Sequence, residues 1–217
     1  MIKFAIFDLD GTLLDSSEMW QTLGIRYLEL VGVKPEEGLA AKLFEMSLPE
    51  SALYLRETYK LPYSAEEIVR HFTRMTERFY REQVALKDGA PRLLAQLRNR
   101  CVKMSIATAG DAALGMAALT RLGVAEFFSG AVSCTEYGAK TSPEVFLAAA
   151  ELMYAVPEET VVFEDSLHAV RSAKKAGFRT AAVYDIGESC PGELEKTADH
   201  YAGTLDELTD KLAEILA

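Results

Sequence analysis

The sequence FAIFDLDGTLLDS, residues 4–16, indicates the fold of this chain. It begins with an unbroken apolar run and continues into an acidic turn that contains Gly11. A short apolar run bounded by turn residues is typical of a strand that is buried on both faces of a parallel sheet. Asp8 and Asp10 stand where this strand ends, and open α/β sheets bind ligands beyond the carboxyl ends of their strands. The stretch therefore predicts a buried strand that ends in a site with two carboxylates.

The composition limits the classes of partner. The chain has 217 residues, of which 49% are hydrophobic, and this suits one large domain or a domain with a smaller insertion. The formal net charge of −10 argues against a nucleic acid as partner, because binding a phosphate backbone requires clustered lysine and arginine. We expect no membrane partner either, because no stretch approaches the roughly 18 apolar residues of a membrane span. The apolar run at the start is too short for a signal peptide.

The cysteines indicate a compartment. They are odd in number and widely spaced, which predicts neither a disulfide framework nor a zinc site. The three are Cys101, Cys134 and Cys190. Buried or half-buried free thiols suit a reducing environment, so we expect a cytoplasmic protein. The sequence does not indicate the oligomeric state.

The rest of the chain shows two kinds of pattern. Residues 17–84 carry apolar side chains at spacings of three and four, which predicts four helices. The clearest helix has Ser64 as its N-cap and Glu67 three residues later, in a capping box. Residues 1–16 and 85–217 alternate helices with five short apolar strands, which is typical of a Rossmann-like, doubly wound parallel sheet. We therefore expect an α/β core domain with an inserted helical cap domain that covers the site as a lid.

Polar residues follow the next predicted strands as well. At the ends of the second to fourth strands they are, in order, Thr108-Ala109-Gly110, Lys140 and Glu164-Asp165. Converging carboxylates repel one another unless a cation joins them, and ligation by oxygen alone suits Mg²⁺. A hydroxyl group and backbone N–H groups at the start of a helix can bind an anion, and a lysine beside them can neutralise a phosphoryl group. Because a carboxylate can attack an electrophile, these residues predict phosphoryl transfer to an aspartate. Asp185, after the fifth strand, has no role in this scheme.

The motifs DLDGT, TAG, KTSP and FEDS, in this order, resemble those of the haloacid dehalogenase superfamily. With the helical insertion, the chain is most similar to the branch of β-phosphoglucomutase and phosphoglycolate phosphatase. The resemblance implies the strand order 5-4-1-2-3. It also implies that Asp8 is the nucleophile and becomes an aspartyl-phosphate, whereas Asp10 is the general acid and base. The dehalogenases lack an acid at the position of Asp10, because a halide leaves without a proton. An acid there indicates phosphate esters as substrates.

The resemblance further implies which residues bind phosphate and metal. The expected phosphate-binding residues are Asp8, Thr108, Ala109 through its amide, and Lys140. The expected Mg²⁺ ligands are Asp8, Asp10 through its carbonyl oxygen, Asp165 and Glu164.

Three functions are compatible with these motifs. In β-phosphoglucomutase the first cap helix carries a histidine five residues after the last acid of the DxDGTxxD run, where this chain has Trp20. The mutase also has an arginine in a short cap segment whose nearest match here, residues 46–51, contains none. A non-enzymatic phospho-accepting module would lack both the second acid and the inserted cap. We therefore predict a Mg²⁺-dependent phosphatase of small phosphorylated metabolites. The sequence does not identify the substrate. Glu18, Lys42, Glu45 and Arg56 are candidate contacts of the cap with the substrate, and the sequence does not distinguish among them.

Overall fold

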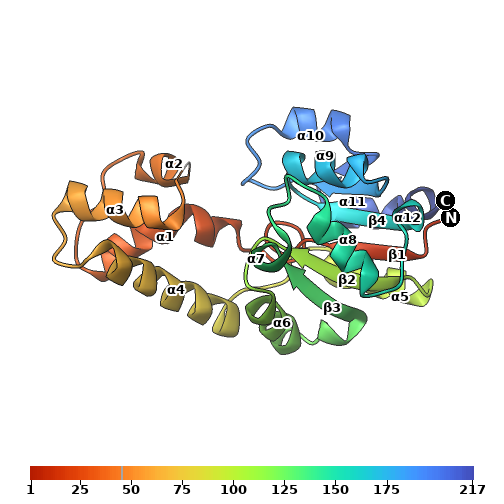
Figure 1. Ribbon diagram of the computed structural model, residues 1–217, viewed down its shortest axis with the longest axis horizontal. Coiled ribbons are helices and arrows are strands. Elements are labelled where there is room, and N and C mark those ends of the chain that lie inside the picture. Colours follow the sequence, from red (N-terminus) through yellow and green to blue (C-terminus); the bar gives the residue numbers. More distant parts are fainter. Residues whose placement is uncertain (45) are drawn as a thin grey trace. The chain divides into compact units, whose positions relative to one another are not determined.

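The computed structural model describes residues 1–44 and 46–217, without the side chain of Phe44 (Figure 1). Glu45, one of the candidate substrate contacts, lies outside the described residues. The chain divides into two compact units. The sheet unit consists of Met1–Asp15 and Val84–Ala217, and the helical unit consists of Ser16–Gln83.

The sheet unit is built on a parallel sheet with helices on both of its faces (Figure 1). Within the described residues the sheet has six strands, in the order β3-β2-β1-β4-β5-β6. Their bounds are β1 Phe4–Phe7, β2 Lys103–Thr108, β3 Phe128–Ser133, β4 Thr160–Glu164, β5 Arg179–Val183 and β6 His200–Ala202. The predicted doubly wound parallel sheet and its order 5-4-1-2-3 are confirmed. The predicted number of five strands is wrong, because β6 pairs with the outer edge of β5.

β1 lies at the centre of the sheet, as its apolar sequence predicts. Ala5, Ile6 and Phe7 are fully buried, and the ring of Phe7 stacks on that of Phe163 in β4, with 4.5 Å between the centroids. Phe7 is in register with Phe163 on one side and with Ile106 of β2 on the other. The carboxyl ends of the three strands are therefore level with one another, and the residues that follow them come out at one edge of the sheet.

Short helices connect the strands of the sheet unit and follow the last strand. They are α5 Ala90–Asn99, α6 Ala112–Arg121, α7 Cys134–Tyr137, α8 Glu144–Glu151, α9 Leu167–Lys175, α10 Pro191–Thr197, α11 Leu205–Asp210 and α12 Leu212–Leu216. Two 3₁₀ turns, Ala125–Phe127 and Pro157–Glu159, precede β3 and β4. The side chain of Asp111 caps α6 by accepting the Leu114 N–H at 3.0 Å, and that of Thr204 caps α11 by accepting the Glu207 N–H at 3.2 Å. These caps explain why α6 and α11 begin where they do.

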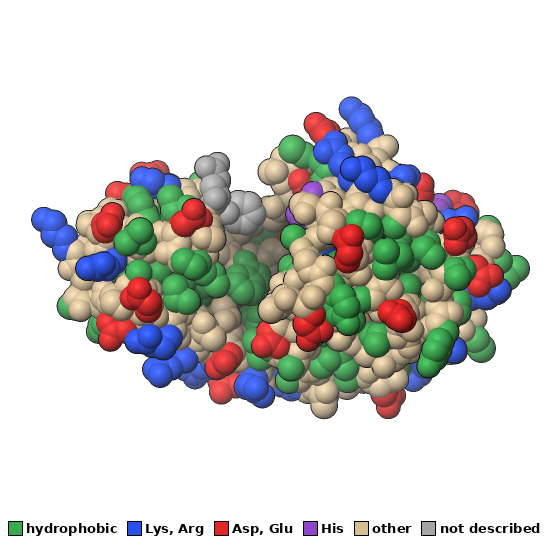
Figure 2. Space-filling view, in the orientation of Figure 1, with side chains coloured by type: hydrophobic (Ala, Val, Ile, Leu, Met, Phe, Trp, Pro, Cys, Tyr) green, Lys and Arg blue, Asp and Glu red, His purple; other side chains and the backbone are tan. Residues whose placement is uncertain are grey.

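The helical unit has a hydrophobic core of its own. Its helices are α1 Ser17–Leu30, α2 Leu39–Phe44, α3 Leu48–Tyr59 and α4 Ala65–Glu82. Tyr27 and Phe72 are buried at the centre of this core, with their rings edge to face. The capping box at α4 is present, because Ser64 accepts the Glu67 N–H at 3.2 Å and Glu67 accepts the Ser64 N–H at 2.8 Å. Figure 2 shows basic side chains over the helical unit, and the exposed arginines of α4 are Arg70, Arg74, Arg78 and Arg81.

The two chain segments that border the helical unit pair with each other inside the sheet unit. The Asp15 N–H donates to the Ala85 carbonyl at 3.0 Å, and the Lys87 N–H donates to the Leu13 carbonyl at 2.8 Å. Leu14 and Leu86 form an antiparallel bridge between these two hydrogen bonds. The chain thus leaves and re-enters the sheet unit through one short two-stranded ladder, directly after the acidic turn.

Two further expectations can be compared with the structure. The three cysteines are free thiols, as predicted, but Cys101 and Cys190 are exposed rather than buried or half-buried. No helix in the described part of the chain combines the length and the apolar character that crossing a bilayer requires.

Candidate active site

Three carboxylates meet at the carboxyl ends of β1 and β4. One oxygen from each of Asp8, Glu164 and Asp165 lies within 4.8 Å of the others. Asp8 and Glu164 are almost fully buried, and Asp165 is half-buried. The register between β1 and β4 explains this arrangement, because the Asp8 N–H donates to the Phe163 carbonyl at 3.0 Å. Four residues were expected to bind a metal ion. The structure brings the carboxylates of three of them together, and the fourth, Asp10, was expected to bind through its carbonyl oxygen.

Lys140 supplies a buried positive charge to this cluster. Its ammonium group donates to Asp8, and to Glu164 at 2.5 Å, and only 5% of its side chain is exposed. Burial alone would lower the pKa of Lys140, but the nearby carboxylates of Asp8 and Glu164 outweigh this effect and raise it. Lys140 is therefore protonated at neutral pH and bridges the two carboxylates.

The cluster still holds an excess of negative charge. Burial raises the pKa of Asp8 to about 7, because Lys140 offsets only part of the effect of burial and of the neighbouring acids Glu164 and Asp10. Burial and the charges of Glu164 and Asp8 also raise the pKa of Asp165 well above its ordinary value. Buried acids that repel one another in this way are the arrangement that a divalent cation relieves. The donor atoms are all oxygens, and so fit Mg²⁺.

Hydrogen bonds orient the second and third carboxylates of the cluster. One oxygen of Glu164 accepts from Lys140, and the other accepts the backbone N–H groups of Asp165 at 2.9 Å and Ser166 at 3.0 Å. Asp165 accepts the hydroxyl of Thr12 at 3.0 Å. Glu164 is thus fixed between Lys140 and the segment that begins α9, whereas Asp165 is fixed by the turn after β1.

The loop between β2 and α6 carries the residues that were expected to bind phosphate. Thr108 is buried, and its hydroxyl oxygen accepts the Gly110 N–H at 3.0 Å. The Ser133 hydroxyl at the end of β3 donates to the Gly110 carbonyl, also at 3.0 Å. Ala109, whose amide was expected to bind phosphate, is exposed in this loop.

Asp10 faces the same loop. A side chain built on Gly110 would place its first carbon 3.5 Å from a carboxylate oxygen of Asp10 and 3.5 Å from the Thr108 hydroxyl. The two groups therefore flank one small residue. The expected acid, the expected phosphate ligand Thr108 and the Asp8 cluster all lie at the carboxyl edge of the sheet.

Sequence reasoning missed an ion pair beside this cluster. Asp185, at the end of β5, is buried, and one of its oxygens accepts from Lys87 at 2.8 Å. Lys87 also donates to the carbonyl oxygens of Gly11 and Tyr184. The position of Asp185 at a strand end was a signal for a role in the site, but the sequence gives no comparable signal for Lys87.

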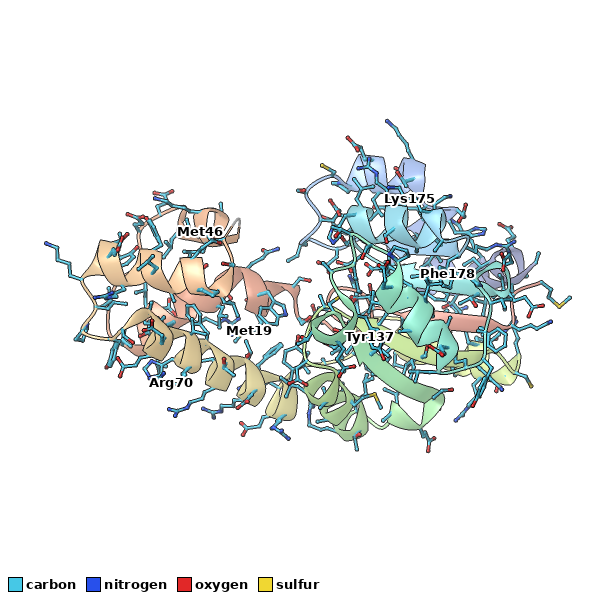
Figure 3. The ribbon with its side chains drawn as sticks, in the orientation of Figure 1. Met19, Met46, Arg70, Tyr137, Lys175 and Phe178 are labelled. Atoms are coloured by element: carbon cyan, nitrogen blue, oxygen red, sulfur yellow. The ribbon has the colours of Figure 1, made fainter. Side chains whose placement is uncertain are left out.

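A separate cavity lies within the helical unit. It has a volume of about 330 Å³ and is lined by residues of α1, α2, α3 and α4 and of the segment before α3, among them Trp20, Ser47, Ser51 and Phe72. Met46, which also lines it, lies beside α2 and α3 (Figure 3). The indole N–H of Trp20 donates to the Tyr80 hydroxyl at 3.1 Å. The cavity wall, as far as the structure describes it, does not include the candidate contacts Glu18, Lys42 and Arg56.

Comparison with known proteins shows the same architecture elsewhere. A phosphorylated carbohydrates phosphatase of Thermotoga maritima is 28% identical over 189 residues, which cover 87% of each chain. A validoxylamine A 7'-phosphate phosphatase of Streptomyces hygroscopicus is 26% identical over 200 residues, which cover 92% of this chain and 91% of that one. The crystal structure of a candidate β-phosphoglucomutase of Thermotoga maritima superimposes with a TM-score of 0.87 at 26% identity, and covers 99% of this chain and 100% of the other.

The family model for haloacid dehalogenase-like hydrolases matches residues 5–183, which include all of β1 but its first residue, the carboxylate cluster, the loop after β2 and Lys140. The sequence motifs, the sheet order and this match agree, and the chain belongs to the haloacid dehalogenase-like hydrolase family.

Proposed function

We propose that this chain is a Mg²⁺-dependent phosphatase that hydrolyses small phosphate monoesters through an aspartyl-phosphate at Asp8. The observation that carries the proposal is the buried contact of Lys140 with Asp8 and Glu164, beside Asp165. Burying charged groups costs desolvation energy, and clusters of buried ionisable groups with shifted pKa values gather at functional sites. The names of the similar phosphatases support a phosphate ester as the substrate.

The first chemical step is the attack of an Asp8 carboxylate oxygen on the phosphorus atom. Lys140 fixes one oxygen of Asp8, which orients the carboxylate. As the new bond between Asp8 and phosphorus forms, the ester P–O bond breaks, and Asp10 gives its proton to the leaving alcohol.

The second step returns the enzyme to its starting state. Asp10, now ionised, takes a proton from a water molecule whose oxygen attacks the phosphorus atom. The bond to Asp8 breaks, inorganic phosphate leaves, and Asp10 is protonated again. During both steps Thr108, the amide of Ala109 and Lys140 would bind the phosphoryl oxygens, so that charge on them is stabilised.

The metal ion would bind at the carboxylate cluster. Asp8 and Asp165 would ligate it with side-chain oxygens, Asp10 with its carbonyl oxygen, and Glu164 would complete the site while it holds Lys140. Bound Mg²⁺ supplies positive charge that stabilises the phosphoryl group during transfer and lowers the repulsion among the acids. The fit rests on the 4.8 Å cluster and on its excess of buried carboxylates.

The helical unit is the proposed cap domain, expected over residues 17–84, and would select the substrate. The free thiols fit a reducing cytoplasm as the place where the enzyme works. A screen of phosphorylated metabolites for phosphate release would identify the substrate class.

The proposed function is tested by phosphate release from p-nitrophenyl phosphate with and without Mg²⁺. We expect release that depends on Mg²⁺ and disappears in Asp8→Asn. Asp15→Asn is the matched control, because Asp15 is an exposed acid of the same stretch. Equal activity of Asp8→Asn and Asp15→Asn would contradict the assignment of the nucleophile.

A sugar-phosphate mutase is the second candidate, favoured by the similarity to a candidate β-phosphoglucomutase. Trp20 opposes it, because this residue occupies the place of the mutase histidine and its indole nitrogen bonds to Tyr80. Incubation with α- and β-glucose 1-phosphate and a bisphosphate primer separates the two functions. Free phosphate is expected for the phosphatase, and an isomerised sugar phosphate without free phosphate would establish the mutase.

A further inference from the structure

Lys87 joins three segments of the sheet unit that are distant in sequence. Its ammonium group donates to the carbonyl oxygen of Gly11, to that of Tyr184 at 2.9 Å, and to a carboxylate oxygen of Asp185 at 2.8 Å. An ammonium group has three donors, so these acceptors use all of them. The side chains of Lys87 and Asp185 are 19% and 7% exposed, which distinguishes this pair from the solvated ion pairs on the surface.

Gly11, one of the three acceptors, lies against the carboxylate cluster. It has a φ of +84°, which favours glycine. A carbon added to it would lie 2.6 Å from an oxygen of Asp165 and 3.0 Å from the carboxyl carbon of Asp185. The backbone of Gly11 therefore lies close to both carboxylates. The next residue, Thr12, donates its hydroxyl to Asp165 at 3.0 Å.

These contacts form a chain of positions that leads to the metal site. Lys87 holds the carbonyl oxygen of Gly11, and this peptide leads directly into Thr12. The position of Thr12 in turn determines where its hydroxyl meets Asp165. The same turn contains the carbonyl oxygen of Asp10, one peptide before that of Gly11. The pairing with Lys87 also neutralises Asp185, and the backbone N–H of Gly187 donates to the other oxygen of Asp185 at 2.8 Å.

We propose that Lys87 is a positioning residue of the metal site. By holding the Gly11 carbonyl and pairing with Asp185, it keeps Asp165 and the Asp10 carbonyl directed at the ion and keeps Asp185 out of the cluster. This inference rests on the Mg²⁺ site of the proposed function. It differs from a purely stabilising role of the ion pair, because it predicts a specific loss of metal affinity.

The test measures the Mg²⁺ dissociation constant by calorimetry, without substrate, for the parent chain and its variants. In Lys87→Met we expect a dissociation constant about 10- to 100-fold higher, the usual effect of removing a partner that orients metal ligands. Asp185→Asn leaves Lys87 its two carbonyl acceptors, so we expect a smaller increase. Lys175→Met is the matched control, because Lys175 is an exposed lysine of α9 (Figure 3), and should leave the constant unchanged.

A second variant separates positioning from folding. Lys87→Met leaves the buried Asp185 without its partner and can unfold the chain for that reason alone. The double variant with Lys87→Met and Asp185→Asn removes both charges, and we expect it to fold and still to bind Mg²⁺ about 10-fold or more weakly. Its phosphate release should recover at high Mg²⁺ concentration.

The outcomes distinguish this inference from the proposed function. A double variant that binds Mg²⁺ as tightly as the parent overturns the role of Lys87, while the parent's Mg²⁺-dependent phosphate release stands. A parent chain that binds no Mg²⁺ overturns both.

Discussion

The ammonium group of Lys140 contacts the carboxylate of Asp8 in the interior of the sheet unit, although the two residues are 132 positions apart in the chain. β1 and β4 bring Asp8 beside Glu164, and Lys140 lies between them. This contact gives Asp8 a fixed orientation and a nearby positive charge, the two properties that an attacking carboxylate needs.

Replacement of Lys140 should show that its charge stabilises the buried acids around it. Lys140→Met leaves Asp8 and Glu164 buried without their cation, so we expect the free energy of unfolding to fall by roughly 3–5 kcal/mol. Urea denaturation measures the change. Lys3→Met is the control, because the exposed pair of Lys3 and Glu159 should contribute about 1 kcal/mol or less. An equal fall in the free energy of unfolding in the two variants would mean that the buried contact stabilises the fold no more than the exposed one.

The raised pKa of Asp8 predicts how the metal-free protein responds to pH. Because the pKa of Asp8 is about 7 when folded and 3.8 without the fold, the folded state holds the proton more tightly. The stability that this proton contributes is complete below the unfolded pKa and is lost as the pH rises through the folded one. The variant Asp8→Asn has no proton to lose at this position, so its stability does not fall in this way as the pH rises. In EDTA its melting temperature should exceed that of the parent by more at about pH 8 than at about pH 5.

Thermal unfolding in EDTA at several pH values measures this difference. A difference between the variant and the parent that stays constant with pH would show that Asp8 titrates at its ordinary pKa. Asp8→Asn should remain folded throughout, so its lack of turnover would be a chemical effect.

Gly11 should tolerate no side chain. Gly11→Ala would place a carbon 2.6 Å from Asp165, so we expect the rise in melting temperature on adding Mg²⁺ to disappear. Gly123→Ala is the matched control, because Gly123 has a similar φ of +76° but open space around it. It shares the backbone strain and should keep the full response to Mg²⁺. Loss of the response in both variants would assign the effect to strain alone.

Thr108 should be needed for binding the phosphoryl group. In Thr108→Val the hydroxyl is lost, and with it the acceptor for the Gly110 N–H, so we expect kcat/KM for p-nitrophenyl phosphate to fall about 100-fold or more. Thr108→Ser keeps the hydroxyl and should lose much less. Steady-state kinetics at saturating Mg²⁺ give both values, and a valine variant as active as the serine variant would remove Thr108 from the site.

The sequence predicted those parts of the fold that depend on local pattern. The apolar run before Asp8 indicated the central strand, the apolar spacing indicated the four helices of the helical unit, and the capping box at Ser64 indicated the start of α4. β6 escaped prediction because its three residues, His200–Ala202, are too few to show a pattern and form a strand only by pairing with β5.

The candidate site also has a part that the sequence predicts and a part that it does not. Asp8, Thr108 and Glu164 stand at strand ends, so their position at one edge of the sheet follows from a parallel sheet with this strand order. The pair of Lys87 and Asp185 could not be predicted, because no motif contains Lys87 and the contact depends on the turn at Gly11. The lining of the helical cavity likewise depends on how α1, α2, α3 and α4 pack, which the spacing of apolar residues alone does not determine.

The central claim is that Asp8 becomes covalently phosphorylated, and rapid quenching tests it most directly. The chain is mixed with p-nitrophenyl phosphate and Mg²⁺, quenched in acid within one turnover, and reduced with borohydride, which converts an acyl phosphate to an alcohol. Peptide mass spectrometry then locates the converted residue. We predict homoserine at position 8 and unmodified aspartate at positions 10 and 15. Conversion at another residue, or phosphate release with no converted residue at any quench time, would contradict the account.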